Sequence, residues 1–100
     1  MHAYTIEFVE QAIADIKRLR ATVRARIVEE IEKQLSYEPT VETRRRKRLE
    51  GLEPPWKHTP PVWQLRVSDW RVFYDVDDRV KTVIVRAVRK KRQKQTEEIL

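Results

Sequence analysis

The stretch that decides the fold consists of three consecutive segments, Val62-Trp-Gln-Leu-Arg-Val67, Trp70-Arg-Val-Phe-Tyr-Asp-Val76 and Val80-Lys-Thr-Val-Ile-Val-Arg-Ala-Val88. All three are rich in β-branched and aromatic residues, which favours strands. Links of two and three residues join them, and such short links connect antiparallel neighbours. Because strand side chains alternate between faces, we expect Arg66, Arg71 and Arg86 to lie on one surface of a small sheet.

The first half of the chain predicts one strand and two helices. Residues 4–8 alternate and are rich in strand formers, so they predict a first strand. Apolar residues then recur at helical spacing over residues 9–19 and 23–35, and we expect Thr22 to cap the second helix. The two helices should form a hairpin on the aliphatic face of the sheet. The sequence therefore predicts an α+β domain with a four-stranded sheet, antiparallel except for mixed pairing at its first strand.

The segment over residues 40–61 has four prolines in its second part and is expected to be irregular. It contains the basic run Arg44-Arg-Arg-Lys-Arg48, followed by Gly51, the only glycine of the chain. A single glycine in such a segment indicates a turn with positive φ. A loop this long in a compact domain is often functional.

The composition indicates a single globular domain over residues 1–100. Apolar residues make up 40% and charged residues 38% of the chain, and there is no cysteine, which excludes disulfides and thiolate metal sites. No apolar run approaches the ~20 residues that span a bilayer, and the start lacks a signal-peptide pattern. We therefore expect a cytoplasmic protein. With only two histidines, His2 and His58, we expect no metal site and no cofactor.

The net charge of +6 is unevenly distributed. Residues 1–38 have six Lys or Arg against seven Asp or Glu, a balance of −1, whereas residues 39–100 have sixteen against nine, a balance of +7. A clustered positive surface favours nucleic-acid binding over a merely solvated one. The candidate binding residues are Arg44, Arg45, Arg46, Lys47, Arg48, Gln64, Phe73, Arg86, Arg89, Lys90 and Arg92.

Arginine is the main candidate for a functional side chain in this protein, because its planar guanidinium group can bind two phosphate oxygens at once. Phe73 and Trp56 could stack on an unpaired base, worth ~1–3 kcal/mol. The alternative for Phe73 is packing against the proline-rich loop. His58 could act as a general base, although an exposed loop histidine is the simpler interpretation.

The chain resembles the RelE/ParE superfamily of bacterial toxins in its order of elements, a strand followed by a helical hairpin. It also resembles this superfamily in three stretches of sequence: Arg48-Leu-Glu-Gly-Leu52, the segment from Val62 to Val76, and Val83-Ile-Val-Arg-Ala-Val-Arg-Lys-Lys91. The resemblance covers nearly the whole chain. It implies a small sheet flanked by two helices and a cognate antitoxin, encoded by an adjacent gene, with which the toxin can form a heterotetramer. RelE-like members cut mRNA in the ribosomal A site with the RNA's own 2′-hydroxyl and no metal. ParE-like members poison DNA gyrase.

The resemblance also implies roles for individual residues. Arg71 matches the arginine that would stabilise the scissile phosphate. Arg66 matches a basic residue of the preceding strand, and Lys91 matches the residue that would act as general acid. Gln64 stands where another cation is often found. The C-terminal tyrosine or histidine that acts as general base in RelE-like enzymes is missing from residues 93–100, which leaves a lysine, Glu97 or His58 for that role.

Three functions are compatible with these features. The first is a ribosome-dependent mRNA endonuclease that inhibits translation, for which ribosome and mRNA are the partners. The second is a toxin that inhibits gyrase by binding, which the missing tyrosine favours. The third is a nucleic-acid-binding relative without catalysis. The sequence does not identify the antitoxin, the codon preference or the oligomeric state.

Overall fold

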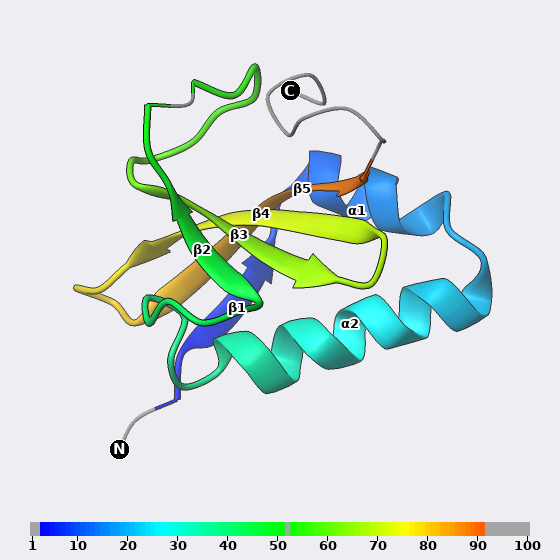
Figure 1. The fold of residues 1–100 in the computed structure, drawn as a ribbon, viewed down its shortest axis with the longest axis horizontal. Coiled ribbons are helices and arrows are strands. Elements are labelled where there is room, and N and C mark those ends of the chain that lie inside the picture. The colour runs from blue at the N-terminus through cyan, green and yellow to red at the C-terminus, as the bar shows by residue number, and fades with distance from the viewer. Residues whose placement is uncertain (1–2, 52, 92–100) are drawn as a thin grey trace.

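The computed structural model describes residues 3–51 and 53–91, which form a five-stranded sheet packed against two helices (Figure 1). The elements in chain order are β1 (Thr5–Phe8), α1 (Glu10–Lys17), α2 (Ala21–Leu35), β2 (Arg46–Leu49), β3 (Val62–Val67), β4 (Trp70–Asp77) and β5 (Thr82–Lys90). Their order across the sheet is β1-β5-β4-β3-β2. β1 is parallel to β5, and all other neighbours are antiparallel. The expected α+β class and the N-terminal helical hairpin are confirmed.

The expected count of four strands was one too low. Arg46–Leu49, within the segment expected to be irregular, forms the edge strand β2 and pairs with β3 so that Arg46 lies opposite Leu65. This pairing supplies partners for backbone groups of β3 that would otherwise need water. Gly51 follows two residues after β2 and has the expected positive φ of 70°.

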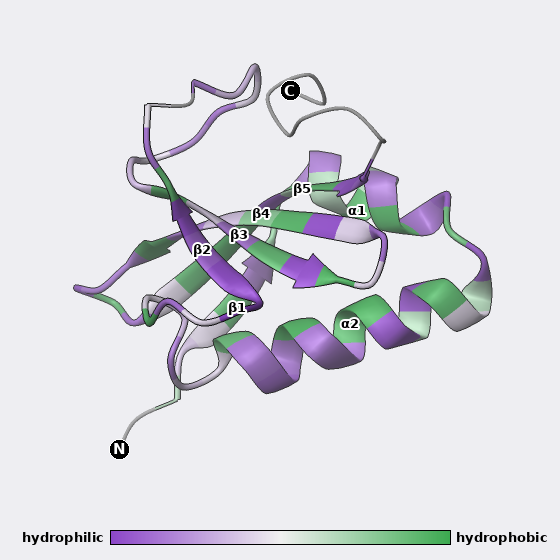
Figure 2. Ribbon diagram, viewed as in Figure 1, coloured by the Kyte–Doolittle hydropathy of each residue, from purple (hydrophilic) through white to green (hydrophobic). Residues whose placement is uncertain are grey.

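Both helices bury one apolar side against the same face of the sheet (Figure 2). α2 begins at Ala21 with Arg20 as its N-cap residue and no side-chain cap, so Thr22 does not have the expected capping role. No helix within the described part of the chain is long and apolar enough to cross a membrane. The buried core between helices and sheet consists of Ala12, Ile16, Ile27, Ile31, Leu35, Trp63, Leu65, Val67, Val72, Tyr74, Val83, Val85 and Val88.

The opposite face of the sheet is partly covered by the loop between β2 and β3. Trp56 of this loop packs on Phe73 of β4, with ring centroids 5.2 Å apart. Two bonds fix the loop and the strands beneath it, because Asp75 accepts from the backbone N–H of Thr59 and pairs with Arg86 at 2.8 Å. We call this assembly the loop-covered patch.

A register shift between β4 and β5 changes which side chains of β5 face each way. Phe73 lies opposite Ala87, whereas Tyr74 lies opposite Val85, so Arg86 is an extra residue on β5. Such a bulge reverses the alternation beyond it and re-aims the side chains that follow. As a result Val88 enters the helix-side core, and Arg89 faces the other way.

Candidate functional site

Three arginines on three adjacent strands form a row across the face that the helices do not cover. Arg66 of β3 lies directly opposite Arg71 of β4, and Arg71 lies directly opposite Arg89 of β5. Directly opposed side chains on a sheet are about 5 Å apart at Cβ, and like charges at such positions are destabilising. We call Arg66, Arg71 and Arg89 the arginine row. Three cations at such positions therefore lower the stability of the fold.

Arg71, at the centre of the row, is held in place by the turn between β3 and β4. Its Nη1 donates to the carbonyls of Ser68 and Trp70, at 3.0 and 2.9 Å, and the residue is buried. Burial and the neighbouring Arg66 lower the pKa of Arg71, while Asp69 acts in the opposite direction. The guanidinium is thus oriented by the backbone and experiences a positive surrounding that a phosphate would relieve.

Arg89, at one end of the row, is fixed from two sides. It pairs with the buried carboxylate of Asp15 on α1, whose Oδ2 also accepts from the backbone N–H of Val88 at 2.9 Å. The guanidinium carbon of Arg89 lies 5.1 Å from the ring centre of Trp56. This end of the row is therefore already neutralised within the protein. The positive charge left for a ligand lies on the exposed Arg66 and on the donors of the buried Arg71 other than Nη1.

Lys91, the expected general acid, follows β5 at the same end of the sheet. Its backbone N–H donates to the carbonyl of Asp69 at 2.6 Å, which places it beside the turn that holds Arg71. Lys90 is exposed and lies opposite Trp70. Arg92, Glu97 and the expected capping residue Thr96 lie outside the described residues.

Three of the expected nucleic-acid-binding residues have structural roles instead. Phe73 is fully buried beneath Trp56, so its ring cannot stack on a base in this conformation. Arg86 is engaged by Asp75. Arg46 faces the helix side, where its guanidinium donates to the carbonyl of Val41 at 3.0 Å and to the carbonyl and side chain of Gln34. Their surroundings satisfy or enclose all three side chains.

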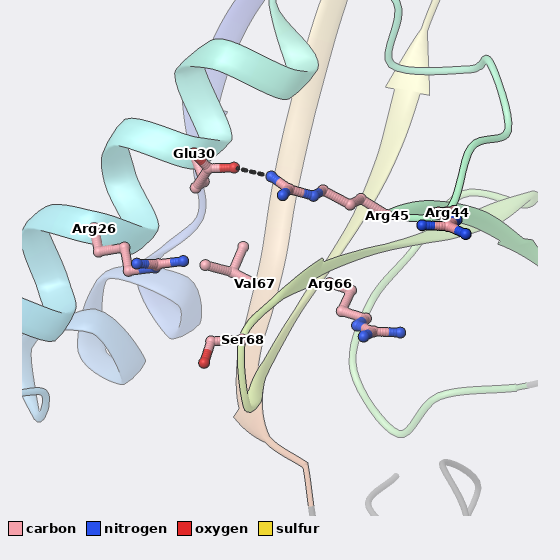
Figure 3. Close-up of a pocket in the computed structure, with 7 residues that line it drawn as sticks. All are labelled: Arg26, Glu30, Arg44, Arg45, Arg66, Val67 and Ser68. Atoms are coloured by element: carbon pink, nitrogen blue, oxygen red, sulfur yellow. Dashed lines mark hydrogen bonds and ion pairs between the residues drawn. The ribbon is translucent and has the colours of Figure 1, made fainter.

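A pocket of about 520 Å³ lies between α2 and the turn end of β3 (Figure 3). Its lining residues are Arg26, Glu30, Arg44, Arg45, Arg66, Val67 and Ser68. Arg45 reaches across it to Glu30, with a distance of 3.0 Å. We call it the arginine pocket. It brings two residues of the predicted basic run, Arg44 and Arg45, together with Arg66 of the arginine row, whereas Lys47 and Arg48 lie exposed on β2.

Among residues 3–51 and 53–91, no histidine or tyrosine that could act as general base lies beside the arginine row. His58 lies in a different pocket, with Glu53 and Arg48, and its Nδ1 is 2.9 Å from the carbonyl of Trp56. Tyr74 is directed to the helix side, where its hydroxyl donates to the carbonyl of Pro39 and burial raises its pKa far above the usual value. Gln64 is half-buried between Lys47 and Phe73. The described residues also include no cluster of acids and histidines suited to a metal ion.

Sequence reasoning missed Asp15, Arg26 and Glu30. Asp15 follows the buried Ala12 by three positions and precedes the buried Ile16. A charged residue at the edge of the apolar side of a helix could have indicated that this carboxylate has a partner inside the protein. Arg26 and Glu30 are one helical turn apart on α2, where such a pair is usually only solvated. Arg26 and Glu30 line the pocket only because β3 and residues 44–45 lie beside α2, and the pattern of residues along the helix gives no information on that position.

Comparison with known proteins places this architecture in a recognised group. Residues 6–95 match the family described as ParE toxin of type II toxin-antitoxin system, parDE. A chain of the RelBE2 toxin–antitoxin complex from Mycobacterium tuberculosis is 27% identical, with a TM-score of 0.68 over 90% of this chain and 99% of that one. The isolated RelE toxin of E. coli is 23% identical, with a TM-score of 0.69 over 96% and 93% of the two chains, and shows the shared fold. Among curated proteins, none matches the chain significantly.

Proposed function

The chain belongs to the ParE toxin family of type II toxin–antitoxin systems, and we propose that it inhibits translation by cutting mRNA on the ribosome. The arginine row is the observation that supports this activity. Its central guanidinium is oriented by two backbone carbonyls, and its neighbour Arg66 is exposed. An oriented guanidinium with a second cation beside it suits the negative charge that develops on a phosphate during cleavage, because the oriented group needs little reorganisation.

The proposed reaction uses the RNA as its own nucleophile. The 2′-oxygen forms a bond to the adjacent phosphorus and gives its proton to a base, while the bond from phosphorus to the 5′-oxygen breaks. Arg71 and Arg66 stabilise the negative charge on the non-bridging oxygens. Lys91, beside the turn that holds Arg71, donates a proton to the leaving 5′-oxygen. The base belongs to the RNA's surroundings on the ribosome or to a part of the chain beyond the described residues.

We further propose that an antitoxin neutralises this chain by covering its positive surface. The similar chain from M. tuberculosis was solved in a toxin–antitoxin complex. Residues 39–100 of this chain have a balance of +7, which an acidic or amphipathic segment would complement. Co-purification with the product of the adjacent gene tests this partner. A chain that is abundant and harmless without any partner would contradict it.

Gyrase inhibition is the second candidate, and two observations favour it. The matching family is described by ParE, and no tyrosine or histidine lies beside the arginine row within the described residues. A gyrase inhibitor needs no base, because it acts by binding. The arginine row would then contact the enzyme or its DNA.

One experiment separates the two functions. Purified toxin is added to ribosomes programmed with a defined mRNA, and cleavage is mapped by primer extension, while the same preparation is tested on gyrase supercoiling. We expect cuts in mRNA that require the ribosome and no effect on supercoiling. Intact mRNA together with inhibited supercoiling would replace the nuclease proposal by the gyrase one.

A further inference from the structure

Hydrogen bonds fix the backbone that carries Arg44, Arg45 and Arg66 at the arginine pocket. The hydroxyl of Thr43 accepts from the backbone N–H groups of Arg45 and Arg46, both at 3.1 Å. The carbonyl of Arg45 then accepts from the N–H of Arg66 at 2.7 Å. These bonds attach residues 43–46 to the end of β3, so Arg44, Arg45 and Arg66 line the same pocket, with Arg45 directed to Glu30 on α2 (Figure 3).

The charge of the pocket favours an anion, and its lining favours a phosphate over a protein segment. Four arginines line it against one acid, Glu30, and its single apolar residue, Val67, is only 3% exposed. A docking protein segment normally buries an apolar centre, whereas the lining of this pocket is mainly polar. A nucleic-acid backbone contributes charge and hydrogen-bond acceptors, which are what four guanidinium groups recognise.

The pocket is continuous with the arginine row, because Arg66 belongs to both. A strand whose phosphate lies at Arg71 can therefore pass Arg66 and place a flanking phosphate between α2 and β3. We propose that the arginine pocket is a second phosphate site, which holds the RNA backbone next to the cleaved position and in which Arg26 of α2 is the outer contact. This inference rests on the proposed action on RNA and adds a defined path for the strand.

Glu30 has a specific part in this proposal. Its half-buried carboxylate pairs with Arg45, whose side chain is 56% exposed. In the absence of RNA it occupies the guanidinium that a phosphate would use. Binding therefore exchanges one anion for another, and removal of the carboxylate should make Arg45 available at no cost.

The test measures binding without cleavage. A fluorescent single-stranded RNA oligonucleotide with 2′-O-methyl groups lacks the nucleophile, and its affinity is followed by anisotropy over a series of salt concentrations. Each phosphate contact in a single strand contributes roughly 0.7 to the slope of log affinity against log salt. We expect Arg26→Gln to reduce the slope by about that amount. Arg79→Gln, which removes the same charge from the distant β4–β5 turn, should leave the slope unchanged.

The opposite change should tighten binding. We expect Glu30→Gln to lower the Kd several-fold more than Glu32→Gln, because Glu32 lies on the same helix but outside the pocket. Equal slopes for Arg26→Gln and Arg79→Gln, or equal effects of the two glutamate changes, would overturn the proposal. A loss of antitoxin affinity in Arg26→Gln without a change in the RNA slope would also overturn it and assign the pocket to the antitoxin. If wild-type protein binds the oligonucleotide in this way but cuts no mRNA on ribosomes, the nuclease proposal fails and the phosphate site remains.

Discussion

The two faces of the sheet differ in composition and in their effect on stability. The helix-covered face is a continuous apolar core from Ala12 to Val88, in which the buried hydroxyl of Tyr74 has a backbone partner. The other face combines a small apolar cluster around Phe73 with a buried ion pair and three directly opposed arginines. The first arrangement stabilises the fold, whereas the arginine row lowers stability unless an anion is bound. The two faces thus differ in their contribution to stability, and the following predictions test the proposal that the second face serves binding.

The largest stability effect should come from the ion pair of the loop-covered patch. Asp75→Ala leaves Arg86 buried without its partner and removes the acceptor for the N–H of Thr59. Breaking one side of a buried pair typically costs about 3–5 kcal/mol. Urea unfolding should therefore show a loss of that size. Asp77→Ala, at the half-buried end of β4 where the carboxylate accepts from the nearby Arg79, is the control and should cost much less; a similar loss in both variants would contradict a buried role for Asp75.

The largest activity effect should come from the centre of the arginine row. Arg71→Ala removes a positioned donor to the phosphate, which typically costs roughly 100- to 1000-fold in rate. Arg71→Lys should recover little, because lysine cannot reproduce the planar fork. Primer extension on programmed ribosomes measures the rate. Antitoxin binding and thermal unfolding serve as controls for the fold, and near-wild-type cleavage by Arg71→Ala would rule out the assigned role.

Lys91→Ala should impair cleavage less than Arg71→Ala, since Lys90 is adjacent and exposed. General acid catalysis typically contributes about 100- to 10,000-fold, so partial replacement by a neighbour should leave a smaller loss. The same ribosome assay measures it over a range of pH. Because loss of the acid should weaken the dependence of the rate on proton concentration, an unaltered pH profile would argue for a binding role of Lys91.

The helix-covered face should show a modest effect at its one buried hydroxyl. Tyr74→Phe removes the bond to the carbonyl of Pro39 and leaves that carbonyl without this donor. A bond of this kind contributes about 0.5–1.5 kcal/mol. Thermal or urea unfolding should show a loss of this size with cleavage unchanged. A strong loss of cleavage would contradict the separation of the two faces.

The smallest effect has the opposite sign. Arg66→Gln removes one of two directly opposed charges and should raise the free energy of unfolding by about 0.2–1 kcal/mol, the usual size of such cross-strand terms. The same change should weaken RNA binding and cleavage. Arg79→Gln, which removes the same charge from the distant β4–β5 turn, provides the control. A variant of Arg66 that is less stable than wild type would show that the arginine row is not a cost to the fold.

The sequence was sufficient for the elements whose pattern is local. The three C-terminal strands followed from their alternation and short links, and the shared face of Arg66 and Arg71 followed with them. The resemblance to the RelE/ParE superfamily is confirmed. The strand β2 could not be read in the same way, because the charged residues of Arg46–Leu49 have no strand signal of their own and owe their conformation to pairing with β3.

The rest of the site depends on register, which a single sequence does not contain. Strict alternation along β5 would place Arg89 on the same side as Val83 and Val85, and only the extra residue Arg86 turns Arg89 toward Arg71. Register also determines the burial of Arg46. This residue lies on the same, helix-covered face as its partner Leu65, while its neighbours in the basic run are exposed. The burial of Phe73 depends in turn on the path of the loop that carries Trp56.

The position of β5 also has a consequence for biosynthesis. β5 lies between β1 and β4, so the first strand to leave the ribosome pairs only with the last. Contacts between residues so distant in sequence form late and slow the folding of small domains. The nascent chain therefore cannot complete its sheet, or align Arg89 with Arg71, until β5 has been made. For a member of a toxin family, this delay postpones activity until β5 has been made and leaves time for a neutralising partner to be present.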